Sequence, residues 1–254
     1  MDKKLLRRAR VFLHKRPPLA TPYTSAVVLA GGSGSRMGAE IPKQYLSLLG
    51  KPVLVHTLLA FEACRLIREI VLVTRAGDVE YCRTLCQQYG IKKCKTIVTG
   101  GEQRVDSARF GVMHTDPACE YVAIHDAARC LITPKQIREV ANAAYAYQAA
   151  TAATPAVDTI KRANAYGFIE ETLPRESAWC AQTPQIFHRA YYLGALEKAK
   201  KEQKSFTDDN MLMELIGQRV FLVDTGADNF KITVASDLAR AEAVLCEREK
   251  EKKK

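Results

Sequence analysis

From Ser25 onward, apolar runs alternate regularly with amphipathic stretches along this chain. The runs at 26–30 and 70–73 are continuously apolar, which is typical of strands covered on both faces. Such strand–helix repetition predicts one α/β domain, a Rossmann-like, mostly parallel sheet with right-handed crossovers and helices on both faces. The predicted strands are 25–30, 69–74, 94–99, 121–126, 151–156 and 219–224, and the predicted helices are about 52–64, 78–89, 103–115, 134–149, 188–203, 208–217 and 236–247.

The alternation of predicted strands and helices stops between the fifth strand and the later helices. Residues 157–175 are polar, contain turn residues and lack helical periodicity. We interpret this segment, called the arm below, as a protruding β-hairpin with its tip near Asn164 to Gly167. The predicted organisation is a basic N-terminal extension (1–24), a domain (25–246) that carries the arm, and a charged C-terminal tail (247–254).

The formal net charge of +10 raises the question of a nucleic-acid partner. Residues 1–16 carry seven Lys and Arg against Asp2, and residues 247–254 carry five against three Glu. The ends therefore hold eight of the ten excess charges, whereas a nucleic-acid binder more often spreads basic groups over a folded face. We expect no specific nucleic-acid partner. Residues 5–13 have an amphipathic pattern that could contact a membrane surface or a partner, but a loosely docked extension is the simpler interpretation.

The eight cysteines show neither zinc-ligand spacing nor a preceding secretory signal. Free thiols in such a chain indicate a reducing compartment, so we expect a cytoplasmic protein. No stretch approaches the roughly 18 apolar residues of a membrane span.

A glycine-rich loop, AGGSGSRMG at 30–38, directly follows the first predicted strand. Glycines let backbone N–H groups approach a phosphate closely. The loop lacks the closing GK[ST] of a Walker loop, and Met37 stands where a dinucleotide fingerprint needs glycine. Arg36 and Lys43 follow the glycines and suit a triphosphate whose leaving pyrophosphate must be stabilised. The alternative is a surface loop with two solvated cations.

Further polar side chains follow other predicted strands, where open parallel sheets bind ligands. Asp126 ends the strand at 121–126 and could hold Mg2+, although it could also cap the following turn. Lys231 lies between apolar residues, where its charge needs an anionic partner such as a substrate phosphate, unless it is exposed at a sheet edge. Arg104 and Asp106, after the third strand, could pair with each other.

Seven motifs together resemble the 2-C-methyl-D-erythritol 4-phosphate cytidylyltransferase family of nucleotidyltransferases. They cover nearly everything from Ser25 to Leu245 in the family's order, and each alone is weak. They are GGSGSRMG followed by PKQYL, GGEQRVDS (100–107), HDAAR (125–129), VDTIK (157–161), AQTPQIF (181–187), TDD (207–209) and NFKIT (229–233).

This resemblance implies transfer of CMP from CTP to a sugar-alcohol phosphate, with Mg2+ as cofactor, and a homodimer in which the arm serves the neighbouring subunit. The implied catalytic residues are Arg36, Lys43, Arg175 and Lys231. The implied CTP-binding residues are Ala30, Gly31, Gly32, Gly34, Ser35, Gly101, Glu102, Ser107 and Ala128. The implied residues for the second substrate are Asp126, which also contacts the metal, Arg129, Thr159, Thr183, Thr207 and Asp208.

Two positions depart from the family's usual pattern. Glu102 stands where aspartate is common, which is harmless if the backbone reads the base and less so if the carboxylate does. Cys130 stands where proline usually follows Arg129, which puts the local loop shape in question.

The same motifs leave other functions open. Ribitol-5-phosphate cytidylyltransferase has the same scaffold and nearly the same motifs, although DTIK, RESAWCAQTPQ and TDD favour the erythritol enzyme. More distant alternatives are a non-catalytic nucleotide-binding protein and RNA or membrane binding through the basic ends.

Overall fold

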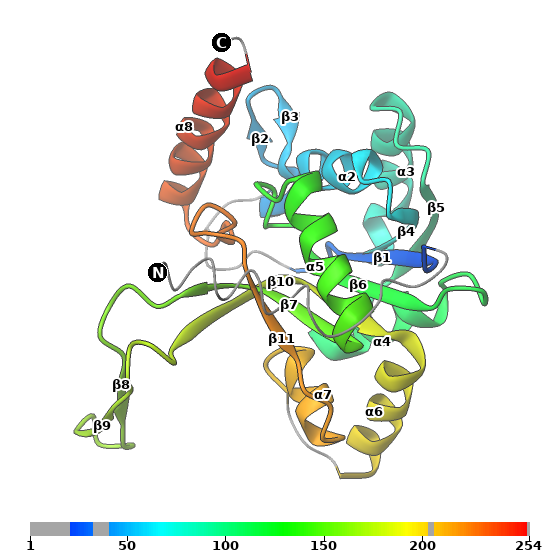
Figure 1. Ribbon diagram of the computed structural model, residues 1–254. Helices are drawn as coiled ribbons and strands as arrows, with labels where there is room; N and C mark the ends of the chain where they lie inside the picture. The colour runs from blue at the N-terminus through cyan, green and yellow to red at the C-terminus, as the bar shows by residue number, and fades with distance from the viewer. Residues whose placement is uncertain (1–20, 33–40, 203–205, 253–254) are drawn as a thin grey trace.

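The computed structural model describes residues 21–32, 41–202 and 206–252, so the N-terminal extension up to residue 20 lies outside the described part. A seven-stranded sheet forms its centre (Figure 1). In spatial order the strands are β11 (Phe221–Asp224), β7 (Ala149–Pro155), β10 (Trp179–His188), β6 (Tyr121–Asp126), β1 (Thr24–Leu29), β4 (Ile67–Thr74) and β5 (Cys94–Thr99).

Helices cover both faces of this sheet, as the sequence predicts. One face packs against α2 (Val53–Ala63), α3 (Val79–Gln88) and α5 (Pro134–Tyr147). The opposite face packs against α4 (Arg104–Met113), α6 (Arg189–Glu202) and α7 (Asn210–Leu215). Each face has its own apolar cluster because successive side chains of a strand point to opposite sides. Val28 therefore packs with α2 and α5, whereas Val27 packs with α4.

Local signals in the sequence fix several boundaries. Helix α5 begins with a capping box in which Thr133 and Gln136 satisfy each other's backbone N–H groups, with Pro134 at the first position. Gln148 ends the helix at a φ of +71°, in the left-handed region. Gly111 allows α4 to approach the sheet, since a Cβ there would lie 2.8 Å from Val73 Cγ2 and closer still to Val27 Cγ1.

Strand β10 is absent from the sequence prediction, which assigned only a motif to this stretch. It runs antiparallel to both β6 and β7, whereas the other neighbouring strands of the sheet are parallel. Its pairing with β7 is interrupted between Ala181 and Gln185, around Pro184, which has no N–H to donate. Buried polar side chains such as Gln182 and Thr183 hide the strand from hydrophobic patterning.

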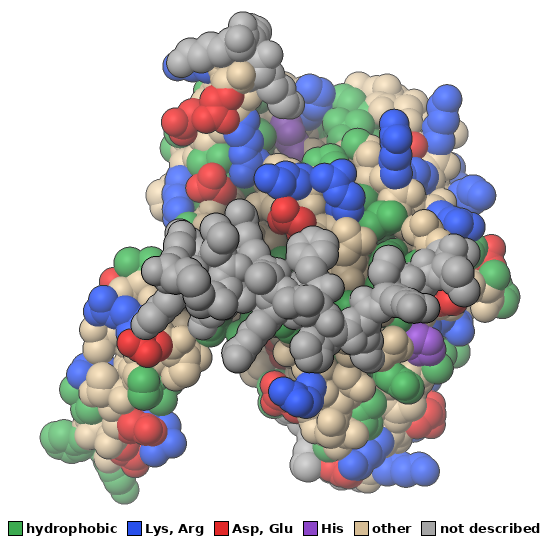
Figure 2. Space-filling view, in the orientation of Figure 1, with side chains coloured by type: hydrophobic (Ala, Val, Ile, Leu, Met, Phe, Trp, Pro, Cys, Tyr) green, Lys and Arg blue, Asp and Glu red, His purple; other side chains and the backbone are tan. Residues whose placement is uncertain are grey.

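The arm is a hairpin of β8 (Lys161–Ala163) and β9 (Ile169–Thr172), and its turn lies at Asn164 to Gly167, which confirms that prediction. It extends away from the body of the molecule (Figure 1), and Figure 2 shows hydrophobic side chains at its end. Tyr166 is 87% exposed and Phe168 72%. The arm thus has no core of its own within this chain.

The C-terminal region differs from the expected charged tail. Helix α8 (Ala235–Lys252) continues beyond residue 247, and Arg248 Nη1 donates a 2.6 Å hydrogen bond to the carbonyl oxygen of Leu131. The apolar side of α8 packs on Leu48, beside the short hairpin of β2 (Ser47–Leu48) and β3 (Lys51–Pro52), and on Ile232. Two single turns complete the elements, η2 (Lys43–Tyr45) and η3 (Ala76–Asp78). None of the described helices is long and apolar enough to cross a membrane.

Candidate active site

A pocket of about 290 Å³ opens at the carboxyl ends of the central strands. This is the position that an open parallel sheet provides for ligands. The segments that follow β1, β5 and β6 meet there with Lys43 and Lys231. Its lining is Leu29, Ala30, Gly31, Gly32, Lys43, Gln44, Gly101, Glu102, Gln103, Arg104, Ser107, Asp126, Ala127, Ala128, Lys231 and Thr233.

Asp126 lies between two cations in this pocket. Its Oδ2 accepts a 2.8 Å hydrogen bond from Lys231 Nζ, and its Oδ1 lies 3.2 Å from Arg104 Nε. Burial by itself would raise the pKa of Asp126, but the positive charges of Arg104 and Lys231 outweigh burial and lower that pKa below its ordinary value. Asp126 is therefore ionised at neutral pH.

Arg104 joins this pair to a second, deeper carboxylate. Its Nη1 lies 2.6 Å from Oδ2 of Asp209, a residue that is 1% exposed. Asp209 also accepts a 2.7 Å hydrogen bond from the buried hydroxyl of Tyr192. Arg104 thus pairs with Asp126 and Asp209, and the alternative pairing with Asp106 is wrong. Sequence reasoning missed Arg104 as a pocket residue, although a cation at the first position of a helix that follows β5 was a usable signal.

Lys43 and Gln44 fasten neighbouring segments around the pocket. Lys43 Nζ donates a 2.8 Å hydrogen bond to the carbonyl oxygen of Ile232. Gln44 is buried, and its Nε2 donates to the carbonyl oxygens of Ala30 (2.7 Å) and Gly32 (3.3 Å). Gln44 therefore fixes the start of the glycine-rich loop. It was another residue that sequence reasoning missed, although it is part of the PKQYL motif.

His125 is buried at the end of β6 and hydrogen-bonds to two neighbouring segments. Its Nε2 lies 3.2 Å from the carbonyl oxygen of Arg129, so this nitrogen carries the proton, and its Nδ1 accepts from the Thr183 hydroxyl at 3.0 Å. The same hydroxyl oxygen accepts from the backbone N–H of Asp126. Burial lowers the pKa of His125 to about 3, so the ring stays neutral. Thr183 thus orients Asp126, although it does not line the pocket itself.

The loop after β5 is held tightly against α4. The Ser107 hydroxyl accepts a 3.2 Å hydrogen bond from the N–H of Gly101. A Cβ on Gly101 would lie 2.5 Å from Cβ of Asp106, so this backbone approach requires glycine. Glu102 is next in the lining, and Ala128 contributes its carbonyl oxygen to the Ile232 N–H at 2.8 Å. Cys130 is buried, and burial raises its pKa to about 12.

Several predicted site residues lie elsewhere. Arg175 and Thr159 bond to each other on the arm at 3.1 Å and are exposed. Asp208 accepts the backbone N–H of Met211 and the side-chain amide of Gln185, so it orders the start of α7. Arg129 donates to the carbonyl oxygen of Asn229 at 2.9 Å. Thr207 contacts Met211, and Gly34, Ser35 and Arg36 lie outside the described residues.

The described residues contain no cluster of three or more His, Cys, Asp or Glu side chains that could hold a metal ion. Asp126 is the ionised carboxylate whose partners in the pocket are cations. This set of residues fits Mg2+ if the protein supplies a single carboxylate ligand. Phosphate oxygens and water would then fill the other coordination positions of the ion.

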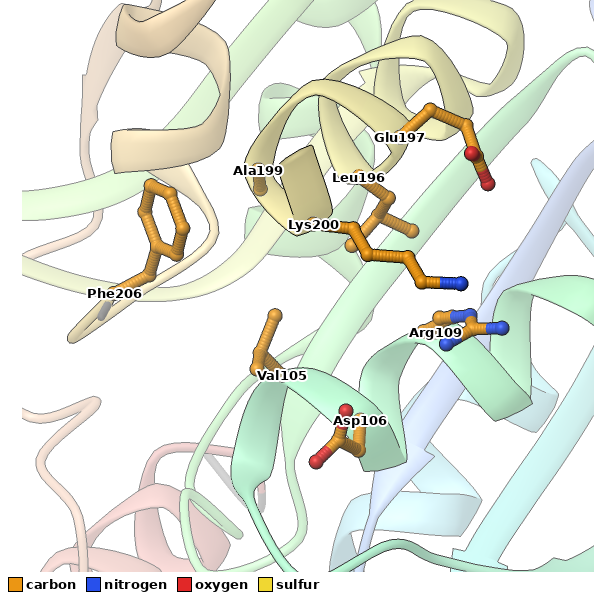
Figure 3. A pocket seen from close by; sticks show the side chains of 8 residues that line it. All are labelled: Val105, Asp106, Arg109, Leu196, Glu197, Ala199, Lys200 and Phe206. Atoms are coloured by element: carbon orange, nitrogen blue, oxygen red, sulfur yellow. The ribbon is translucent and has the colours of Figure 1, made fainter. Parts of the chain in front are cut away.

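A second pocket lies between α4 and α6 (Figure 3), and Val105, Asp106 and Arg109 line it from α4, whereas Arg104 and Ser107 of the same helix line the first pocket. Arg109 and Lys200 point toward one another there, and Asp106 and Glu197 lie in the same lining. Among the residues that the structure describes, none of the predicted site residues lines this pocket, and its lining shares no residue with that of the candidate active site.

Comparison with known proteins gives a consistent result. The family model of IspD, 2-C-methyl-D-erythritol 4-phosphate cytidylyltransferase, matches residues 24–247. A protein of that name from Pelotomaculum thermopropionicum is 45% identical over 222 residues, which are 87% of this chain and 93% of that protein. Another from Syntrophus aciditrophicus is 43% identical over 225 residues, covering 88% and 96%.

Solved structures resemble the fold over a similar range. The crystal structure of 4-diphosphocytidyl-2C-methyl-D-erythritol synthase from Anaerococcus prevotii has a TM-score of 0.80 and 28% identity, covering 89% of this chain and 99% of that one. The 2-C-methyl-D-erythritol 4-phosphate cytidylyltransferase from Thermus thermophilus has a TM-score of 0.70 and 27% identity, covering 87% and 98%.

Proposed function

The chain belongs to the 2-C-methyl-D-erythritol 4-phosphate cytidylyltransferase family, and we propose that the pocket around Asp126 is where its reaction takes place. The chain is a cytidylyltransferase of isoprenoid synthesis. It transfers CMP from CTP to 2-C-methyl-D-erythritol 4-phosphate, and the products are 4-diphosphocytidyl-2-C-methyl-D-erythritol and pyrophosphate. The alternative acceptor, ribitol 5-phosphate, is not favoured.

The observation that carries the site assignment is the meeting of Lys43, Arg104 and Lys231 beside the glycine-rich loop at one edge of the sheet. Arg104 and Lys231 contact the buried carboxylate of Asp126, and Lys43 lines the same pocket, so the site has an excess of positive charge that suits polyphosphate. Backbone N–H groups of Gly31 and Gly32 would contact the triphosphate from the other side. The cytosine would be contacted by Gly101, Glu102 and Ser107, and backbone atoms would recognise the base.

The reaction requires no covalent intermediate with the protein. A phosphate oxygen of the acceptor attacks the α-phosphorus of CTP, a new P–O bond forms, and the bond to pyrophosphate breaks. Lys43, together with Arg36, would stabilise the charge that develops on the leaving pyrophosphate. Lys231, which is 34% exposed at its side chain, would leave Asp126 to contact the incoming phosphate. Mg2+, held through Asp126, would neutralise phosphate charge when bound.

The arm completes the proposal as a dimer contact. Its exposed apolar tip and the absence of an arm core within one chain support packing against a second copy. Arg175 and Thr159 would then act at the partner's pocket. All eight cysteines lie in the described residues as free thiols, which supports a cytoplasmic location.

The test is pyrophosphate release by the purified protein with CTP and Mg2+, comparing 2-C-methyl-D-erythritol 4-phosphate with ribitol 5-phosphate. Release with the erythritol substrate alone is expected. Release with ribitol 5-phosphate alone would keep the mechanism and change the acceptor. Release with neither substrate would contradict the proposed function.

A further inference from the structure

We infer that Asn229 is a positioning residue for this reaction, because its buried side-chain amide fixes the segment that carries Lys231. The inference rests on the proposed function of Lys231 in the pocket. Asn229 itself is absent from the pocket lining and is completely buried, so it acts through its neighbours.

The amide nitrogen of Asn229 makes two hydrogen bonds to groups on β10. Nδ2 donates to Oε1 of Gln182 and to the carbonyl oxygen of Thr183, both at 2.8 Å. The backbone oxygen of Asn229 meanwhile accepts from Arg129 Nη1 at 2.9 Å. One residue therefore joins β10, the turn after β6 and its own loop. Its side-chain oxygen has no hydrogen-bond partner in the described residues, so the two donated bonds fix its orientation.

Gln182 extends this connection along the loop. Its Oε1 also accepts from the Thr225 hydroxyl at 2.9 Å, and its Nε2 donates to the carbonyl oxygen of Gly226 at 3.1 Å. Gln182 can bond to this loop because it lies in the interruption of β10, where pairing with β7 stops at Ala181 and resumes at Gln185. The interruption turns polar groups of a central strand toward the loop instead of the neighbouring strand.

Lys231 lies two residues after Asn229 in the loop that these hydrogen bonds hold in place. Lys231 Nζ lies 2.8 Å from Asp126, and the next residue, Ile232, bonds through its backbone to Ala128 and to Lys43 Nζ. A lysine has a flexible four-carbon stem, so the backbone beneath it decides where its charge can reach. A shift of about 1 Å at a reacting centre can cost on the order of 100-fold in rate.

Asn229→Asp tests the inference with almost no change in shape. An ionised carboxylate cannot donate, so the two bonds to Gln182 and Thr183 become contacts between oxygens. We expect kcat/KM for the acceptor phosphate to fall on the order of 10-fold to 100-fold. Tyr145→Phe is the matched control. It removes the 2.6 Å bond between Tyr145 and Thr24, which lies away from the pocket lining, and turnover at a temperature where it is folded should stay at the wild-type value.

A double-mutant cycle with Lys231→Met distinguishes positioning from general destabilisation. If Asn229 acts through Lys231, adding Asn229→Asp to Lys231→Met should change kcat/KM by less than about threefold. An equal loss in both backgrounds, or wild-type turnover by Asn229→Asp with only a lowered melting temperature, would overturn the inference. If Asn229→Asp does not fold, Gln182→Met takes its place in the same cycle with the same two outcomes.

The wild-type protein is assayed in parallel so that two failures remain distinct. Absence of turnover by the wild type contradicts the proposed function. Wild-type turnover combined with an additive cycle contradicts the role of Asn229 and leaves the proposed function intact.

Discussion

Lys231 Nζ and Asp126 Oδ2 lie 2.8 Å apart, although the two residues are 105 positions apart in the sequence. The pair joins the end of β6 to the loop before α8. Arg104 is on the other oxygen of the same carboxylate, so Asp126 keeps one cation when Lys231 moves to a substrate phosphate. Asp126 therefore avoids the large free-energy cost of a buried carboxylate without any cationic partner.

Lys231→Met removes the charge and keeps much of the stem. We expect kcat/KM in pyrophosphate release to fall on the order of 100-fold, because a donor aimed at the phosphate is lost. Folding should persist, since Asp126 still contacts Arg104. Lys200→Met, in an exposed position on α6, is the control, and equal rates for the two variants would remove Lys231 from the reaction.

Arg104→Met should destabilise the fold as well as the activity. It leaves the buried carboxylate of Asp209 with the Tyr192 hydroxyl but without a cation, which typically costs about 3–5 kcal/mol. Urea unfolding measures this loss. Adding Asp209→Asn should restore much of the stability, because the isolated charge is gone, while turnover should stay low. No restoration would show that the ion pair is not the cause.

His125 makes the stability depend on pH. The pKa of this ring is about 3 in the folded protein and about 6.5 when unfolded, so the unfolded state binds more protons between these values. The free energy of unfolding should therefore fall as the pH drops through about 6.5, with a slope from this group that approaches about 1.4 kcal/mol per pH unit well below that value. Urea unfolding at pH 7 and pH 5.5 measures the slope. His125→Gln, which cannot titrate, should show a smaller slope, and an unchanged slope would assign the effect to other groups.

Gly111→Ala should destabilise the packing of α4 on the sheet. The added Cβ would meet Val27 and Val73, and such overpacking costs about 1–3 kcal/mol. Gly194→Ala is the control on α6, where nothing lies within 4 Å of the added atom and helix propensity should increase stability. Thermal unfolding compares the two. A melting temperature for Gly111→Ala at or above that of the wild type would contradict the close approach.

The arm proposal predicts complementation between inactive subunits. Arg175→Ala and Lys231→Met would each be nearly inactive alone. In heterodimers formed by mixing them, one pocket receives both native residues if Arg175 acts across the interface, so an equal mixture should regain about a quarter of the wild-type turnover. No recovery in a mixture shown to exchange subunits would place Arg175 outside the partner's site.

The strands and helices that depend on a local pattern can be predicted from the amino-acid sequence. Apolar runs such as 26–30 and amphipathic stretches such as 134–149 indicate strands and helices because the burial period differs between the two. Their alternation implies a parallel sheet, and that in turn implies a ligand site after the strands. Lys43, Asp126 and Lys231 therefore follow from the sequence as candidates, and all three line the pocket.

The contacts between residues far apart in the sequence depend on how the whole chain packs. β10 is an antiparallel strand in the middle of the sheet, and its register, not its composition, brings Gln182 and Thr183 beside Asn229. The partners of Arg104 are 22 and 105 positions away, so no local pattern reveals them. Hydrogen bonds and ion pairs between separated segments depend on the packing of the whole chain, and a periodicity reports only the face on which a residue lies.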